Sequence, residues 1–447
     1  MNKFAIYHKP LVSFIAIFFY SLTILSVEAA KPKNIKKLLE TRQCKGCNLK
    51  NADLRGLHLR KTNLQDANLE GANLNGADLR GAFLKDADLT EADLRNARLE
   101  DANLEDVKLD RAKLNNTVVN YRTVIGQKWR LVLEIINGKS SKNLQGADLA
   151  GANFDGLDLR NFDFQGASLQ GASFQGALLK GANFNKANLE ETDLFISDLR
   201  STNFAQANLQ ESSLHFSDLR EANLNQANLI KANLSSSYLE TAQLENANLR
   251  KADLARAILI NANLSNAQLY DANLFAAKLK SVNFAGVDLQ KANLTGADIS
   301  DSILTNGLLR KAKLEGASLR VMNLKGTNLS GLNLSNVDFS GIDLSNTNLS
   351  KANLSGANLQ GTNLNNADLT KTDLSGANLQ GTNLSNADLT KTDLSGANLT
   401  KANLSDANLS FTDFTNANLS QTILSGIKLD FTNFCDATMP NGAKRKC

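Results

Sequence analysis

The chain has 447 residues, with 49 Lys and Arg against 45 Asp and Glu, and a formal net charge of +4. So small a charge over this length argues against a general nucleic-acid binder, which needs a dense basic stripe. Pro is scarce, with 3 residues, and Leu, Ala, Asn and Asp dominate, so the chain must be searched for internal repeats before it is divided into domains.

Residues 1–30 predict a secretory signal peptide. Lys3 and Lys9 supply a positive start, residues 11–27 are largely apolar, and Ala29-Ala30 offers small residues for cleavage. An uncleaved membrane anchor is the alternative, although the apolar run is slightly short for a membrane span. Since no second hydrophobic stretch follows, we expect an exported protein without membrane attachment once the leader is removed.

Residues 31–48 are expected to form an N-terminal cap. Ile35, Leu38 and Leu39 lie at helical spacing and predict a short amphipathic helix. A Cys-x-x-Cys segment follows, with Cys44 and Cys47 at its ends. A repeat array exposes its core at both ends, so a helix here would cover the first repeats.

A five-residue period fills most of the remaining chain. Every fifth residue is apolar over residues 49–119, which gives 15 positions, and again over residues 144–439, which gives 60. Most of these residues are Leu. A small residue, usually Ala, stands two positions earlier, so both share one face of a short extended segment. The next inward residue comes three positions later, which requires a corner. The chain is therefore predicted to coil around a Leu-lined axis.

The number of units per coil can also be predicted. Residues 354–373 and 374–393 are identical except at Asn365 and Ser385, so the copy is 20 residues long. Inward Phe, Ser and Thr residues recur at the same spacing, as at Phe164, Phe184 and Phe204. Four units per coil make a four-sided cross-section with like residues stacked on like.

This pattern resembles the pentapeptide-repeat family, whose motif is A(D/N)LXX. The resemblance implies an all-β solenoid, a right-handed quadrilateral β-helix, here in two stacks over 49–119 and 144–439. The Cys-x-x-Cys segment and the interruption between the stacks are similar to an exported multi-repeat subgroup of photosynthetic prokaryotes. That similarity implies the periplasm or the thylakoid lumen.

The register breaks over residues 120–143, which predict a helical connector. Apolar residues recur at helical spacing, and Asn137-Gly138 supplies a helix stop. We expect this helix to cap the second stack, with Trp129 on its first core layer; a docking helix for a partner is the alternative. The apolar residues are Ile125, Trp129, Val132, Leu133 and Ile136.

All four Cys lie at the ends of the repeat region. In an exported protein an even number favours disulfides. We predict one bond between Cys44 and Cys47 and another between Cys435 and Cys447, which would fold the 440–447 tail over the last coil. A redox-active Cys44–Cys47 pair is the alternative.

No catalytic, cofactor or metal motif is recognisable, so no enzyme activity is expected. His58 and His215 lie at outward positions. Outward columns of Asp, such as Asp373, Asp393 and Asp413, leave bound calcium as an alternative to simple solvation.

Outward apolar residues are the candidate interaction sites. Exposed aromatic clusters mark contacts more often than single residues do. A groove filled by neighbouring side chains, or drift in a tolerant repeat, is the alternative. The candidates are Phe195, Ile196, His215 and Phe216 on adjacent coils, and Phe411 with Phe431 near the C-terminus.

These features favour an exported, non-catalytic structural or interaction protein, with a protein partner or self-association and no nucleic acid. The alternative, implied by the family, is a DNA mimic that inhibits a type II topoisomerase. Mimicry needs a strongly acidic rod, yet residues 144–443 carry 22 basic and 29 acidic residues. Residues 31–143 carry 22 basic and 15 acidic residues, which also disfavours mimicry.

Overall fold

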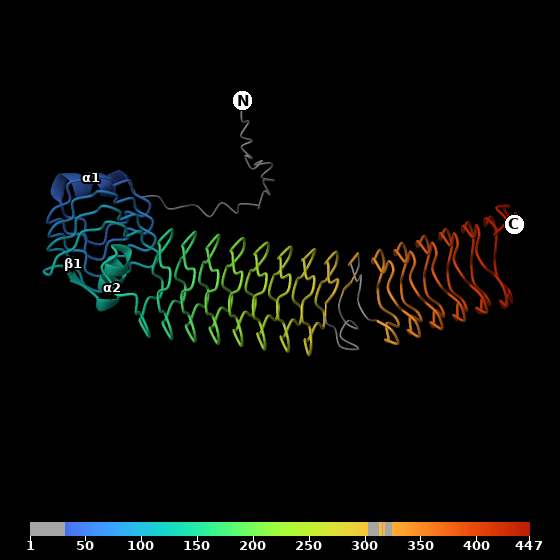
Figure 1. Cartoon of the computed structure of the whole chain (residues 1–447). Coiled ribbons are helices and arrows are strands. Elements are labelled where there is room, and N and C mark those ends of the chain that lie inside the picture. The colour runs from blue at the N-terminus through green and yellow to red at the C-terminus, as the bar shows by residue number, and fades with distance from the viewer. Residues whose placement is uncertain (1–31, 303–312, 315, 318–323) are drawn as a thin grey trace, which may run out of the picture.

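The computed structural model describes residues 32–302, 313–314, 316–317 and 324–447. The predicted signal peptide and residues 303–312, 315 and 318–323 of the second repeat run lie outside these ranges. Figure 1 shows a short stack of coils near the N-terminus and a much longer row of coils that extends from it to the C-terminus. Within the described ranges, neither helix is long and apolar enough to cross a bilayer.

The coils are 20 residues long, as the tandem copy predicts. Parallel one-residue bridges join each side of a coil to the residue twenty positions later, as in Asn183↔Asn203 and Asp198↔Asp218. The backbone N–H of Phe184 donates to the carbonyl of Asn203 on the next coil at 2.7 Å. Four sides of five residues complete one coil. Regular strands are therefore confined, among the described residues, to the two-residue pair β1 (Asn103–Leu104) and β2 (Val124–Ile125).

The core is a set of stacked side chains along the axis of each stack. Most inward Leu, Phe and Ala side chains are almost fully buried, whereas near the C-terminal end Leu424 is only partly buried and Leu429 is 47% exposed. The rings of Phe164, Phe184 and Phe204 stack with centroids 4.7 and 5.2 Å apart. Burying each Leu or Phe contributes ~1.5–3 kcal/mol before the entropy of ordering is subtracted.

Hydroxyl residues replace Ala at several inward positions, and most of them donate to a backbone carbonyl, although Thr62 Oγ1 is buried without a partner. Ser197 Oγ donates to the carbonyl of Phe174 at 2.7 Å, and Thr372 Oγ1 donates to that of Leu349 at 2.8 Å. Outward Asn side chains form a second ladder, since Asn203 Nδ2 donates to Asn183 Oδ1 at 3.0 Å. Each column thus repeats one interaction from coil to coil.

Nearly every corner of the described coils places one residue in the left-handed region of backbone conformation. Gly156 and Gly176 have φ of 68° and 64°, and Asn161 has φ of 60°. Gly carries no steric penalty there and Asn tolerates it better than other residues, which explains their abundance at this position.

Helix α1 (Pro32–Thr41) covers the start of the first stack. Leu38 is fully buried, Ile35 packs against the core, and Asn34 Nδ2 donates to the carbonyl of Asn48 at 3.0 Å. Leu39, which we expected on the same face, is 52% exposed. It directly follows Leu38, so it faces away from the coil. The structure joins Cys44 to Cys47 immediately after this helix.

The first stack continues beyond residue 119, where the repeat register ends. β2 pairs with β1 as Asn103↔Val124, an offset of 21 residues instead of 20. Thr123 Oγ1 donates to the carbonyl of Leu99 at 2.9 Å, as the inward Thr residues do elsewhere. Because one residue is inserted here, this additional side of the coil falls out of the five-residue register and cannot be found by counting in fives.

Helix α2 (Gln127–Ile136) follows and lies at the junction of the two stacks in Figure 1. Trp129, Val132 and Leu133 are buried, while Ile125 and Ile136 are partly buried against the core. Arg130 Nη2 donates to the carbonyl of Thr123 at 2.7 Å, and Asn137 Oδ1 accepts from the backbone N–H of Asn116 at 3.2 Å. These contacts place α2 on the end of the first stack, a role that the sequence did not indicate. Capping of the second stack by Trp129 stays a prediction.

The two stacks also meet directly at Arg111. Its backbone N–H donates to the carbonyl of Gly151 at 2.6 Å, and its Nε donates to that of Gly171 at 3.2 Å. Asn153 Nδ2 donates to the carbonyl of Arg111 at 3.4 Å. In the first coil of the second stack Leu149 and Phe154 are buried, whereas Leu157 and Phe162 are only partly buried.

Candidate functional site

The aromatic corner, defined as Phe195, Ile196, His215 and Phe216, is a continuous cluster on two adjacent coils. The rings of Phe195 and His215 stack with centroids 4.3 Å apart, and that of Phe216 lies 6.2 Å from Phe195 in an edge-on arrangement. Phe195 and His215 are half-buried, whereas Ile196 and Phe216 are 55% and 56% exposed. The structure thus brings all four predicted residues together.

Ile196 and Phe216 occupy left-handed corners, with φ of 56° and 58°. The same corner is Gly156 and Gly176 on the two preceding coils. A β-branched residue in this conformation is a true outlier, and the left-handed conformation costs roughly 1–2 kcal/mol for an L-residue. Ile196 and Phe216, which are exposed and apolar, therefore stand at a corner where Gly fits the backbone best.

An Asp–Arg ladder lies beside the aromatic corner, on the adjoining side of the coils. Arg200 Nε and Nη2 donate to both carboxylate oxygens of Asp198 at 2.8 and 2.7 Å. Arg220 holds Asp218 in the same way, and Arg200 also lies 3.7 Å from Asp218. The Arg200 guanidinium keeps the pKa of the Asp198 carboxyl below its ordinary value. These charges are thus fixed in place before any ligand arrives.

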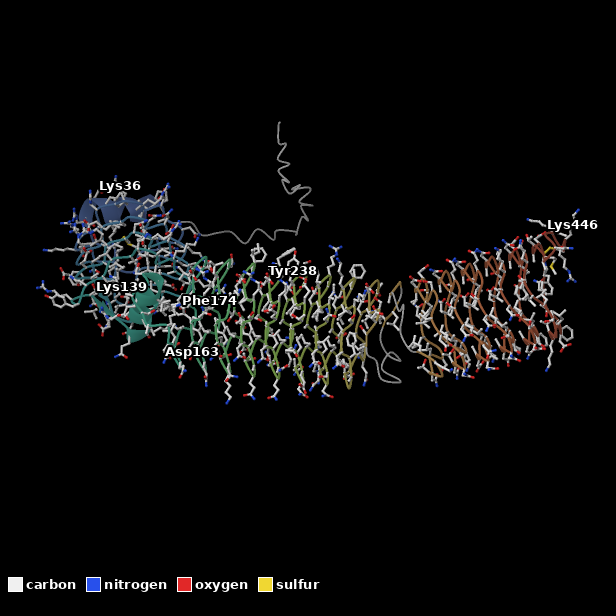
Figure 2. The ribbon with its side chains drawn as sticks, viewed as in Figure 1. Lys36, Lys139, Asp163, Phe174, Tyr238 and Lys446 are labelled. Carbon is white, nitrogen blue, oxygen red and sulfur yellow. A yellow bond between two sulfur atoms is a disulfide. The ribbon has the colours of Figure 1, made fainter. Side chains whose placement is uncertain are left out.

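A shallow hollow of about 270 Å³ separates the ladder from the aromatic corner. Ile196 and Phe216 line one wall, Asp218 and Arg220 another, and Tyr238 closes it one coil further along. Tyr238, on the upper edge of the rod in Figure 2, is 44% exposed. Sequence reasoning missed this residue because it is a single aromatic on its coil. Adding twenty to Asp218 would have placed Tyr238 in the column of Asp198 and Asp218.

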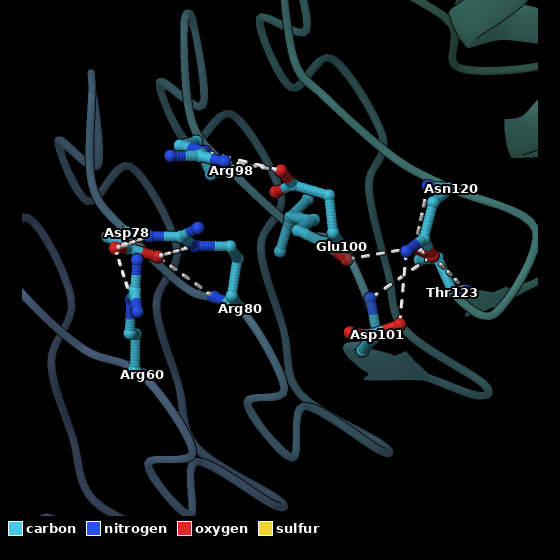
Figure 3. A network of polar contacts seen from close by, with 9 residues as sticks. Arg60, Asp78, Arg80, Arg98, Glu100, Asp101, Asn120 and Thr123 are labelled. Carbon is cyan, nitrogen blue, oxygen red and sulfur yellow. Dashed lines mark hydrogen bonds and ion pairs between the residues drawn. The ribbon is translucent and has the colours of Figure 1, made fainter.

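Similar ion pairs occur in the first stack, as Figure 3 shows. Asp78 accepts from Arg80 Nε at 2.8 Å and from Arg60 Nε on the preceding coil at 2.6 Å. Arg98 Nη2 donates to Glu100 Oε1 at 2.8 Å. No exposed aromatic cluster adjoins these pairs among the described residues, and of the three only the Arg60–Asp78 pair joins adjacent coils.

The C-terminal candidates form a smaller pair. The rings of Phe411 and Phe431 stack with centroids 5.1 Å apart, and Lys391 Nζ lies 5.7 Å from the Phe411 ring. Phe431 is 82% exposed. This pair has no ion-pair ladder beside it in the described structure, so it offers less surface than the aromatic corner.

The remaining predicted residues show no arrangement for chemistry. The structure joins Cys435 to Cys447, so their sulfurs cannot serve as thiolate ligands although Asp436 lies close by. His58 lies outward in the first stack, far along the sequence from the aromatic corner. Asp373 Oδ1 and Asp393 Oδ1 accept from the backbone N–H groups of Ser375 and Ser395. Those carboxylates thus complete local turns.

Comparison with known proteins identifies the class of the chain. The family model described as pentapeptide repeats matches in overlapping segments over residues 47–119, 143–194, 197–235, 237–306 and 308–441. The chain therefore belongs to the pentapeptide-repeat family. That family is one of non-catalytic repeat proteins, and no enzyme family is indicated. No curated protein matches significantly.

Several solved structures are similar to this chain. HetL, from the cyanobacterium Nostoc sp. strain PCC 7120 and involved in heterocyst differentiation regulation, is 26% identical; 68% of this chain and 91% of HetL are covered, with a TM-score of 0.19. A pentapeptide-repeat protein of the Arabidopsis thaliana thylakoid lumen is 38% identical over 21% of this chain and 65% of its own, with a TM-score of 0.15. The plasmid-mediated fluoroquinolone resistance protein QnrB1 is 22% identical over 40% of this chain and 88% of its own, with a TM-score of 0.23.

Proposed function

We propose that this chain is an exported, non-catalytic scaffold that binds a protein partner through the aromatic corner. In this proposal the rod is a right-handed quadrilateral β-helix, and its compartment is the periplasm or the thylakoid lumen. The leader-like residues 1–30 and the two disulfides support export, because disulfides persist in oxidising compartments.

One observation carries the binding role. Ile196 and Phe216 stand at left-handed corners where Gly stands on the two preceding coils, and both side chains are more than half exposed. Their left-handed backbone conformation is unfavourable, and their exposed side chains add little to the core. Strained residues that gain nothing locally are typical of contact sites. The adjoining Arg200 and Arg220 support this role, since aromatic residues and Arg are enriched at the centres of interfaces.

Topoisomerase inhibition by DNA mimicry has less support. The ladder places a guanidinium beside each of Asp198 and Asp218, so this face is not a column of negative charge. The excess of acidic over basic residues across 144–443 is only 7 in 300 residues.

The test is capture of partners from the exported fraction of the source cells. Phe216→Glu should abolish capture of proteins that the unchanged chain retains, while the far-ultraviolet spectrum and thermal unfolding stay the same. Asn246→Glu, at an exposed left-handed corner elsewhere, is the matched control and should capture normally. Equal capture by both variants, or unfolding of Phe216→Glu alone, would show that the corner is a local packing feature.

A further inference from the structure

The Asp–Arg ladder is one part of a longer flat face. This ladder face consists of the outward side chains of residues 158–160, 178–180, 198–200, 218–220 and 238–240. Bridges Asp158↔Leu178, Leu178↔Asp198, Asp198↔Asp218 and Asp218↔Tyr238 stack its coils in register. One column carries Asp158, Asp198 and Asp218, and the column two residues later carries Arg160, Arg200 and Arg220. The face is thus divided lengthwise into a negative and a positive half.

The same two columns end in a pair of groups that lack partners. The Tyr238 hydroxyl makes no hydrogen bond within the described structure, although its side chain is 44% exposed. Glu240, in the positive column one coil beyond Arg220, is half-buried; its Oε2 is a buried atom without a hydrogen-bond partner, so only the rest of the carboxylate can meet a second copy. One group is a donor and the other an acceptor, yet they do not bond to each other within the coil.

We propose that the ladder face pairs with the same face of a second copy, with the two rods side by side and parallel. A two-fold axis along the rods, over the middle of the face, exchanges the two columns and keeps each coil at its own height. Asp198 and Asp218 then face Arg200 and Arg220 of the second copy. The Tyr238 hydroxyl likewise faces Glu240 of the second copy. Such a contact is isologous and closes after two copies.

The opposite orientation of the second copy is disfavoured by charge. A two-fold axis perpendicular to the rods would make them antiparallel and place each column opposite the same column of the second copy. Asp would then face Asp, and Arg would face Arg. Like charges directly opposite one another are destabilising. The charge pattern therefore selects the parallel arrangement among face-to-face pairings.

The surroundings of the ladder suit such a contact. Leu178 is exposed below Asp198, and Ile196 and Phe216 form an apolar edge along one side. Leu178 would face Lys180 of the second copy, whose aliphatic stem can cover it.

The joint with the first stack, at Gly151 and Gly171, lies on a corner that does not border this face. The proposal concerns the purified chain alone and does not depend on the partner of the aromatic corner.

Two charge variants and their mixture test the arrangement. The acidic variant carries Arg200→Asp and Arg220→Asp, and the basic variant carries Asp198→Arg and Asp218→Arg. In sedimentation equilibrium the unchanged chain should dimerise at micromolar to millimolar concentration, more weakly at high salt because exposed charges are screened. Each variant alone should be monomeric, and an equimolar mixture should form a heterodimer. A monomeric unchanged chain, or a mixture that does not associate, would overturn the proposal.

A conservative variant tests the contact without altering charge. Tyr238→Phe removes only a hydroxyl that is unpaired within the chain, so its folding should be unchanged. It should weaken dimerisation about twenty-five-fold, because the symmetric contact contains this hydrogen bond twice and each loss weakens it about fivefold. A Tyr238→Phe chain that dimerises like the unchanged protein would refute the parallel register, because Tyr238 and Glu240 would then not meet across the interface.

Discussion

The imidazole of His215 lies on the phenyl ring of Phe195, one coil away, with ring centroids 4.3 Å apart. The same imidazole is also held within its own coil, since its Nδ1 lies 2.8 Å from Ser213 Oγ. The pair is therefore a fixed platform beside Phe216 and not a loose surface aromatic. Aromatic pairs of this kind contribute about 0.5–1.5 kcal/mol beyond the area that they bury.

We predict that His215→Ala lowers the free energy of unfolding by about 1 kcal/mol, because it removes this stacked pair. His215→Phe keeps a ring over Phe195 and should restore most of the loss. Urea denaturation of the three proteins measures the difference. Equal stability of the Ala and Phe variants would show that the stack contributes nothing.

Replacing Ile196 should stabilise the rod and impair binding together. Ile196→Gly relieves a left-handed conformation that costs a branched residue roughly 1–2 kcal/mol, partly offset by the greater freedom of Gly in the unfolded chain. We expect a net gain of about 0.5–1 kcal/mol in urea unfolding. Gly176 occupies the same corner one coil earlier with φ of 64°, so this backbone accepts Gly. Lower stability of Ile196→Gly would mean that the Ile side chain is part of the packing.

Trp129 should be essential to the junction between the stacks. It is buried in α2, and Trp129→Ala is expected to cost about 3–5 kcal/mol through the cavity that it leaves. Tyr121→Ala, at a residue that is 83% exposed, is the control and should change stability by less than about 0.5 kcal/mol. Thermal unfolding of both variants measures this, and equal melting temperatures would refute a capping role for α2.

The ladder face should lose stability in acid. The Arg160 guanidinium, which hydrogen-bonds to Asp158, lowers the pKa of that carboxyl from 3.8 to about 2. A carboxyl with a lower pKa in the folded state stabilises fully above its unfolded pKa, and the contribution disappears as the pH falls through the folded value. Stability should therefore fall between about pH 4 and pH 2.

Asp158→Asn and Arg160→Gln should each flatten this acid dependence to the same extent, because each removes the same pair. Urea unfolding at pH 7, 4, 3 and 2 measures the effect. If both variants retained the slope of the unchanged chain, the pair would not be responsible for it.

The four cysteines should be unreactive in the oxidised protein. The structure pairs Cys44 with Cys47 and Cys435 with Cys447, and no cysteine is free in the described ranges. Thiol titration in denaturant should therefore find no free thiol before reduction and four afterwards. Cys447→Ser should free the tail, which limited proteolysis would detect as earlier cleavage after residue 440. Four thiols before reduction would contradict both bonds.

Much of the coil could be predicted because each inward residue obeys one simple rule. A Leu every five residues and a repeat of twenty correctly predicted the Phe164, Phe184 and Phe204 column and its ring stacking. The aromatic corner could be predicted for the same reason, since Phe195 and His215 differ by twenty. Local periodicity sufficed wherever each coil contacts only its neighbours.

The junction could not be predicted in this way. The β2 side of the first stack carries one inserted residue, which removes it from the five-residue count. The bonds from Arg111 to Gly151 and Gly171 join residues that no period relates. Ile135, which is buried in α2, was also missed, because a helix wedged at a junction buries more than a single stripe. The Tyr238 hollow depends on neighbours from three coils, each unremarkable alone.

The near-identical segments 354–373 and 374–393 have a consequence for how such a chain can change over generations. Each is one full coil, and bridges such as Asn358↔Asn378 and Asp373↔Asp393 join each side of one copy to the same side of the other. Unequal recombination between the two copies would add or delete one complete turn and leave every side chain facing as before. The length of the rod can thus drift in discrete steps without any intermediate that fails to fold, whereas the aromatic corner, which occurs in no neighbouring turn, cannot be copied or lost by the same event.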